Sequence, residues 1–304
     1  MHILITGATG FIGRKLIHTL LQEDYNVTVV SRDPVSAAKV LPAKVKTISW
    51  DNMELVKALG STNVLVNLAG EPIAGRRWTS RKKVSIMNSR LHAAQRLAGA
   101  LRTAGNENVV YLQASAIGYY GHTDENVCIE STASGNGFLA EVCRKWESLV
   151  PEVEKYQKRV LTLRIGLVLG REGGFLPEVL KQTKRRTAGK MGNGQQWYSW
   201  IHIYDLVYAI IYLMNNENAS GPFNLVAPEP IRQEDLFRSV SLLEKRSLQL
   251  PAPAFMLKAL LGQMGRELIL NGQKVSSSKL IRQGFIFKYT RADDALTDLL
   301  RKQG

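Results

Sequence analysis

The residues that point most directly to chemistry are the glycines of the segment Thr6-Gly7-Ala8-Thr9-Gly10-Phe11-Ile12-Gly13. They follow the apolar run 3–5 at once, and a helical segment begins just after them. Gly7 permits a sharp turn off a strand, Gly10 lets the backbone approach a pyrophosphate, and Gly13 lets the helix pack closely on the sheet. The sequence therefore predicts a dinucleotide site here, formed by Gly7, Thr9, Gly10, Phe11, Ile12 and Gly13.

The end of the second predicted strand indicates which dinucleotide binds. NAD-binding proteins usually place an acidic residue there for the ribose hydroxyls, whereas a nearby arginine accommodates a 2′-phosphate. This chain has Ser31 and Arg32 at that place, with Asp33 one residue later. A guanidinium is always charged and can meet a phosphate with two parallel hydrogen bonds. We therefore predict NADP as the cofactor, held by Ser31 and Arg32, and Arg14 is a weaker candidate for the same phosphate.

These residues need elements that bring them to one edge of a sheet. Buried apolar strands alternate with amphipathic helices along most of the chain, which predicts an α/β fold with a doubly wound parallel sheet. The predicted strands are 27–31, 46–50, 64–69, 109–114, 160–164 and 223–226, and the main helices are 81–103, 138–150, 203–215 and 291–301. Ligands of such sheets bind outside the carboxyl ends of the strands. Thr6, Ser31, Leu68, Ser115 and Gly166 should therefore ring one crevice.

Composition narrows the class of protein. No apolar stretch is long enough to span a membrane, and the early start of the first strand leaves no room for a signal peptide. Cys128 and Cys143 are the only cysteines, without metal-ligand spacing, which suits a reducing cytoplasm and argues against disulfides and a metal site. The net charge is +14, and basic residues gather at 76–77, 81–83 and 181–190. No nucleic-acid motif accompanies them, so we expect no specific nucleic-acid partner.

Several motifs resemble those of a known family. TGATGFIG at the N-terminus, NLAGEPI at 67–73, SAIGYYG at 115–121, LRIGLVLG at 163–170 and WIHIYDL at 200–206 occur in the order seen in extended short-chain dehydrogenases/reductases of the epimerase type. The variants NLAGEPIAGRRW, GNGQQWYSWIHIYDL and NGQKV are similar to an atypical branch of epimerase-family proteins that carries a C-terminal domain of unknown function, DUF1731. This resemblance covers nearly the whole chain. It implies a Rossmann domain over 1–226 and a small C-terminal lobe on the substrate side over 247–296.

The resemblance adds residues to the cofactor site. Leu68, Ala69 and Gly70 should pass beneath the nicotinamide-side ribose, where small residues permit close approach. Arg90 in the following helix should face the cofactor, and Leu167 should border it. Trp50 and Asp51 are weaker candidates for the edge of the adenine site.

The expected acid–base pair is missing. The family typically uses a Ser or Thr together with a Tyr-x-x-x-Lys pair, whose lysine lowers the pKa of the tyrosine. Ser115 matches the serine, but Phe138 and Val142 stand where the tyrosine and lysine should fall. Tyr119 or Tyr120 is a candidate substitute, and both also suit simple packing. Three downstream family positions, Arg164, His202 and Asp205, are expected to be structural.

Two functions remain open from the sequence. One is an NADP-dependent oxidoreductase or epimerase that acts on a small polar substrate, such as a nucleotide sugar. The other is an NADP-binding sensor or regulator without turnover; some relatives carry a name that suggests cell division. The sequence leaves the substrate and a possible homo-oligomer undetermined.

Overall fold

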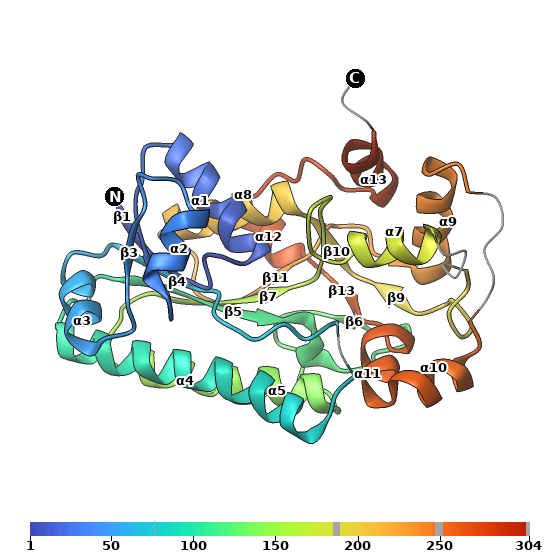
Figure 1. The fold of residues 1–304 in the computed structure, drawn as a ribbon, viewed down its shortest axis with the longest axis horizontal. Coiled ribbons are helices and arrows are strands. Elements are labelled where there is room, and N and C mark those ends of the chain that lie inside the picture. Colours follow the sequence, from blue (N-terminus) through green and yellow to red (C-terminus); the bar gives the residue numbers. More distant parts are fainter. Residues whose placement is uncertain (76, 185–188, 247–251, 302–304) are drawn as a thin grey trace.

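A seven-stranded sheet, all of whose neighbouring strands are parallel, forms the centre of the computed structural model, which describes residues 1–75, 77–184, 189–246 and 252–301 (Figure 1). The strand order is β11–β7–β5–β4–β1–β2–β3. The strands are β1 (His2–Thr6), β2 (Asn26–Val30), β3 (Lys46–Ile48), β4 (Val64–Asn67), β5 (Val110–Ala116), β7 (Val160–Ile165) and β11 (Gly221–Leu225). The predicted doubly wound parallel sheet is confirmed. The winding direction reverses between β1 and β4, where such sheets bind their ligands.

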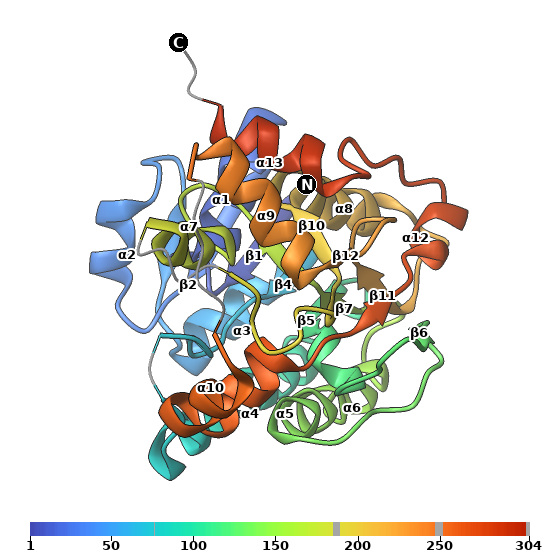
Figure 2. The ribbon, with the colours of Figure 1, turned by 90° about the vertical axis from the view of Figure 1, so that its right-hand side faces the viewer.

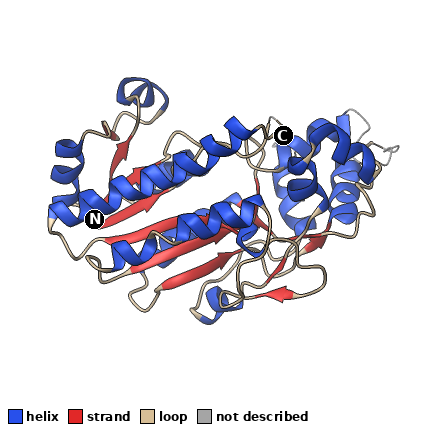
Figure 3. Ribbon diagram, turned by 90° about the horizontal axis from the view of Figure 1, so that it is seen from below, coloured by secondary structure: helices blue, strands red, loops and turns tan. Residues whose placement is uncertain are grey.

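Helices cover both faces of this sheet (Figures 1 and 3). On one face α1 (Phe11–Gln22), α2 (Pro34–Val40) and α8 (Ile203–Asn215) bury Leu16, Ala37 and Ile210 against alternate strand residues such as Ile5 and Val66. On the other face lie α3 (Asn52–Gly60), α4 (Ser80–Ala104), α5 (Phe138–Glu147) and α6 (Val150–Glu154). Because both faces are covered, the strands are apolar along almost their whole length.

Local signals explain where several elements begin and end. Asp51 accepts hydrogen bonds from the amides of Met53 and Glu54 and so caps α3. The strand predicted for 46–50 therefore ends earlier, at Ile48. The helix predicted over 138–150 is divided in two, because Pro151 occupies the first turn of a new helix, α6. By contrast, α8 has the predicted bounds.

Shorter elements lie beyond the carboxyl ends of the strands. They include η1 (Ile117–Tyr120), α7 (Leu176–Lys184), α9 (Gln233–Leu243) and three two-stranded pairs. The pairs join β8 (Leu167–Leu169) to β10 (Trp200–His202), β9 (Trp197–Tyr198) to β12 (Ile231–Arg232), and β6 (Val127–Cys128) to β13 (Lys274–Val275). No single apolar pattern in the sequence predicted these short strands.

The C-terminal segment contacts the rest of the chain at several places (Figure 2). α10 (Ala254–Leu261), α11 (Gln263–Gly265) and the π-helical turn η2 (Arg266–Leu270) lie near the first turns of α4 and α5. β13 pairs with β6, α12 (Ser278–Arg282) contacts β11, and α13 (Ala292–Leu300) packs on α9. The predicted start of the C-terminal lobe, 247–251, and parts of two predicted basic stretches, 76 and 185–188, lie outside the described residues.

Candidate functional site

The glycine segment forms a tight turn between β1 and α1. Gly7 has a φ of 68°, and a Cβ at this position would lie 2.4 Å from the carbonyl oxygen of Leu68. A Cβ at Gly13 would lie 2.6 Å from the Cα of Ala8. Gly10 is the N-cap of α1, no side chain caps the helix, and its first turn contains no acidic residue. The first amides of α1 are therefore available to an anion at the carboxyl end of β1.

Phe11 is held by a second glycine-rich segment. A Cβ at Gly170 would lie 2.2 Å from the ring of Phe11, and one at Gly173 would lie 2.4 Å from it. These glycines follow β8, which begins with the half-buried Leu167. The segment after β8 therefore packs directly on the start of α1, a contact that the sequence pattern alone did not predict.

The end of β2 carries positive charge that no acid within the described ranges meets at ion-pair distance, although Arg32 helps to lower the pKa of the more distant Glu71. Arg32 and Arg14 are exposed, and neither side chain forms an ion pair or hydrogen bond with another described residue. Asp33 caps α2 instead, since its carboxylate accepts from the amide and the hydroxyl of Ser36 at 3.0 and 2.6 Å. These hydrogen bonds hold the pKa of Asp33 below its ordinary value. The carboxylate of Asp33, which follows Arg32, is thus already hydrogen-bonded within the protein.

Past β4, the backbone of residues 68–70 lies against the glycine turn and against Arg90. Leu68 and Ala69 are half-buried, and a Cβ at Gly70 would lie 2.9 Å from the guanidinium carbon of Arg90. Arg90 is 8% exposed, and its guanidinium lies 5.1 Å from the centre of the Trp146 ring. Close approach at Gly70 therefore requires the absence of a side chain there.

Ser115 and Tyr120 lie in a buried polar network. The Ser115 hydroxyl donates to Glu147 at 2.6 Å, and Glu147 also accepts from Arg164 at 3.1 and 2.8 Å. Arg164 donates to the Tyr120 hydroxyl at 2.9 Å, and this hydroxyl donates to Asn224 at 2.7 Å. Burial is the main cause that raises the pKa of Tyr120 to about 12. The sequence analysis missed Glu147, because a lone glutamate late in a helix has no local signature.

Tyr119 differs from these two residues. Its ring lies 3.6 Å from the Arg164 guanidinium, the side chain is half-buried, and its hydroxyl has no hydrogen bond to another described residue. Ser115, Tyr119 and Tyr120 are thus brought together around Arg164. Their catalytic role stays a prediction.

An apolar cluster fills the place where the tyrosine and lysine were expected. Phe138 and Val142 are 8% and 3% exposed, and they pack with Trp78, Ile86 and Met264. The Trp78 and Phe138 rings meet edge to face at 4.9 Å. Neither Phe138 nor Val142 can carry a proton, so this cluster has no acid–base function.

Glu267 from the C-terminal segment holds the start of the same helix. It is 8% exposed, and its carboxylate accepts from the amides of Phe138 and Leu139 at 3.0 and 2.9 Å. A carboxylate at this position satisfies two free amides and complements the helix dipole. Here too the sequence offered no signal, because 129 residues separate Glu267 from Phe138.

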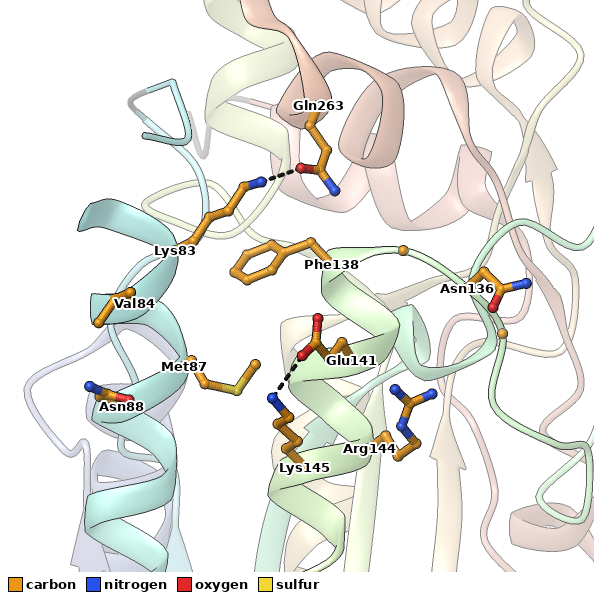
Figure 4. A pocket seen from close by; sticks show the side chains of 12 residues that line it. Lys83, Val84, Met87, Asn88, Asn136, Phe138, Glu141, Arg144, Lys145 and Gln263 are labelled. Carbon is orange, nitrogen blue, oxygen red and sulfur yellow. Dashed lines mark hydrogen bonds and ion pairs between the residues drawn. The ribbon is translucent and has the colours of Figure 1, made fainter. Parts of the chain in front are cut away.

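Beside this cluster, a pocket lies between α4, α5 and Gln263 (Figure 4). Met87 and Phe138 supply apolar surface, and Lys83, Arg144 and Lys145 supply charge. Lys83 donates to Gln263, and Lys145 pairs with Glu141 at 2.7 Å. The pocket lies away from the glycine turn and includes none of the predicted cofactor residues.

The remaining predicted positions have structural contacts. Asp51 is the α3 cap, and the backbone of Trp50 accepts from Arg96. His202 caps α8, and Asp205 accepts from the amides of Lys288 and Tyr289 at 2.8 and 2.9 Å. The described residues contain no cluster of metal-ligating side chains and no helix able to span a membrane.

Comparison with known proteins agrees with this geometry. Residues 3–226 match the model of the NAD dependent epimerase/dehydratase family, and residues 252–299 match the domain of unknown function DUF1731. A chloroplastic epimerase family protein of Arabidopsis thaliana, a homologue of SDR39U1, is 37% identical over 99% of this chain and 87% of its own length. An epimerase family protein of Staphylococcus aureus is 35% identical over 98% of this chain and 99% of its own.

Solved structures agree as well. The crystal structure of the human epimerase family protein SDR39U1 with NADPH has a TM-score of 0.87 and 29% identity, covering 99% of both chains. A UDP-glucuronic acid 4-epimerase from Bacillus cereus, at 18% identity and a TM-score of 0.78, shares the fold over 99% of this chain and 98% of its own. On these matches, the chain belongs to the NAD dependent epimerase/dehydratase family and carries a C-terminal DUF1731 domain.

Proposed function

We propose that this protein binds NADP(H) and acts as an oxidoreductase or epimerase on a small polar substrate. One observation carries the cofactor choice: Arg32, at the end of β2, is exposed and has no ion-pair partner among the described residues, while Asp33 is engaged in capping α2. A guanidinium in that position favours a 2′-phosphate over free ribose hydroxyls. The relative solved with NADPH supports the same choice.

Different residues around the crevice would bind different parts of the cofactor. Thr9, Gly10 and the first amides of α1 would hold the pyrophosphate, and Arg32 with Ser31 would hold the 2′-phosphate. The nicotinamide-side ribose would lie over residues 68–70, near Arg90, with Phe11, Ile12 and Leu167 bordering the cofactor. When bound, the nicotinamide would supply the hydride chemistry.

For proton transfer, the proposal retains Tyr119 and gives Ser115 and Tyr120 a structural role. The hydroxyls of Ser115 and Tyr120 already donate to Glu147 and Asn224 inside the protein, whereas that of Tyr119 has no such partner among the described residues. Changing Tyr119 to Phe should then lower turnover of any accepted substrate more than changing Tyr120 to Phe. An equal or larger effect of Tyr120→Phe on turnover, in a variant that remains folded, would exclude this assignment.

Cofactor binding is tested by titrating the protein calorimetrically with NADPH and NADH. Wild type should bind NADPH more tightly, and Arg32→Glu should remove the difference. A charge-assisted phosphate contact contributes about 1.5–3 kcal/mol, which corresponds to roughly tenfold to hundredfold in affinity.

Arg102→Glu is the matched control. Arg102 is exposed in the last turn of α4, at the end of that helix away from the crevice, so its change should leave both affinities as they are. Equal binding of NADPH and NADH by wild type would contradict the proposed NADP preference.

A second candidate function is an NADP-dependent regulator without turnover. The buried apolar cluster at Phe138 and Val142 favours it, because the usual proton carriers are absent there. Incubation with NADPH and a panel of carbonyl compounds and nucleotide sugars, with product analysis, separates the two functions. Formation of any product would favour the enzymatic function over the regulatory one.

The proposal also covers organisation and location. Residues 1–226 would bind the cofactor, and the lobe expected over 247–296 would lie on the substrate side. The buried, unpaired Cys128 and Cys143 support a reducing compartment such as the cytoplasm.

A further inference from the structure

Two arginines are buried in the described part of the chain, and their surroundings differ. Arg164 is 4% exposed, and Glu147 accepts from its Nε and Nη2 at 3.1 and 2.8 Å. Arg90 is 8% exposed, and no described carboxylate lies within ion-pair distance of it. The Glu71 carboxylate attracts Arg90 from beyond that distance. A buried cation without an anion in direct contact is costly, which favours a contacting anion from outside the chain.

The hydrogen bonds of Arg90 use only one of its nitrogens. Nη1 donates to the carbonyl oxygens of Glu71 and Ile86 at 3.1 and 3.0 Å. Nε and Nη2 have no acceptor among the described residues. Burial lowers the pKa of Arg90, and nearby Cys143 and Glu71 partly oppose this shift. The Nε–Nη2 edge is the planar fork that meets a carboxylate with two parallel hydrogen bonds.

This fork lies next to Gly70, beyond the end of β4. A Cβ at residue 70 would lie 3.1 Å from Nη2 and 3.3 Å from Nε, so only glycine leaves the fork uncovered on that side. The Trp146 ring lies on the guanidinium and helps to fix its position. The fork is therefore positioned by contacts within the chain itself.

The cofactor's own anions have other partners in the proposed function. Its pyrophosphate would meet the start of α1, and its 2′-phosphate would meet Arg32, both at the ends of β1 and β2. Arg90 projects from α4, next to the loop after β4, where the nicotinamide end is proposed to lie. An anion in direct contact with the Nε–Nη2 edge of Arg90 is therefore best supplied by the second ligand.

We infer that the Nε–Nη2 edge of Arg90 binds the carboxylate of the substrate, so that the protein acts on a small carboxylate-bearing molecule. This inference rests on the proposed function, since it places the substrate beside bound NADP(H). Arg90 then selects the substrate by charge and shape, and a neutral analogue of equal size is bound poorly.

The test measures binding rather than turnover. The NADP⁺-saturated protein is titrated calorimetrically at physiological salt with oxalate, a planar carboxylate probe, and with its neutral counterpart oxamide. Oxalate should bind at least tenfold more tightly than oxamide. Arg90→Lys keeps the charge but loses the fork, so it should weaken oxalate binding about tenfold to hundredfold. The loss of oxalate affinity should exceed any loss of NADP⁺ affinity, and Arg102→Lys should change neither.

Each other outcome counts against a specific claim. If wild type binds oxalate no better than oxamide, the carboxylate assignment is wrong, and this comparison needs no variant. If Arg90→Lys weakens NADP⁺ as much as oxalate, the partner of Arg90 is the cofactor and the inference is overturned. If wild type does not bind NADP⁺ at all, the proposed function itself fails. Thermal unfolding of Arg90→Lys shows whether the variant is folded.

Discussion

The stability of this protein should depend on pH through His202, which caps α8. His202 is 3% exposed; its Nδ1 accepts from the amide of Tyr204 at 3.0 Å, and its Nε2 lies 3.4 Å from Asp298. Burial outweighs the attraction of Asp298 and lowers the pKa of His202 to about 4. In the unfolded chain the pKa returns to about 6.5. As the pH falls between these values, the unfolded chain takes up the proton first, so folding loses stability.

The magnitude follows from the two pKa values. Between pH 7.5 and pH 5, His202 should remove about 2 kcal/mol from the free energy of unfolding. Urea denaturation of wild type and His202→Asn at both pH values isolates this contribution, because the asparagine side-chain oxygen can accept the capping hydrogen bond in place of Nδ1 but does not titrate. The stability difference between wild type and variant should therefore shift by about 2 kcal/mol, in the variant's favour at low pH.

The exposed His18, changed to Asn, is the control and should leave the pH dependence of wild type unaltered. A His202→Asn variant that loses stability with pH in parallel with wild type would refute the reasoning. It would mean that groups other than His202 carry the dependence.

Two further predictions concern contacts between distant segments. Glu267→Ala should lower the free energy of unfolding by about 2–3 kcal/mol in urea denaturation, since it leaves two amides of α5 without an acceptor, whereas the exposed Glu107→Ala should have little effect. Equal stabilities of the two variants would show that Glu267 does not hold α5. Gly170→Ala should displace the Phe11 ring, costing about 1–3 kcal/mol of stability and weakening NADPH binding in calorimetric titration. Gly99→Ala, where a Cβ would meet nothing within 4 Å, should change neither stability nor NADPH binding. If Gly170→Ala binds NADPH as wild type does, Phe11 does not contribute to cofactor binding.

Local patterns in the sequence were sufficient to predict the parallel sheet and the glycine turn. Alternation of apolar strands with amphipathic helices requires parallel strands covered on both faces, and the structure has them. The turn at Gly7 and the bounds of α8 follow from residues adjacent in the chain. The absence of the tyrosine and lysine at 138 and 142 was also visible, because it depends only on which residues stand there.

Partners that come from distant parts of the chain were decided by the tertiary structure alone. Glu147 engages Ser115 and Glu267 caps α5, and each of these contacts changes what a nearby candidate residue can do. Periodicity reports which face of an element is buried, but it does not report which side chain meets a buried charge. Arg90 is the clearest case: the sequence placed it near the cofactor, and only the folded chain leaves its fork without a partner. Hydrogen bonds and ion pairs act over a few ångströms, so their partners are known only when the chain has been folded in space.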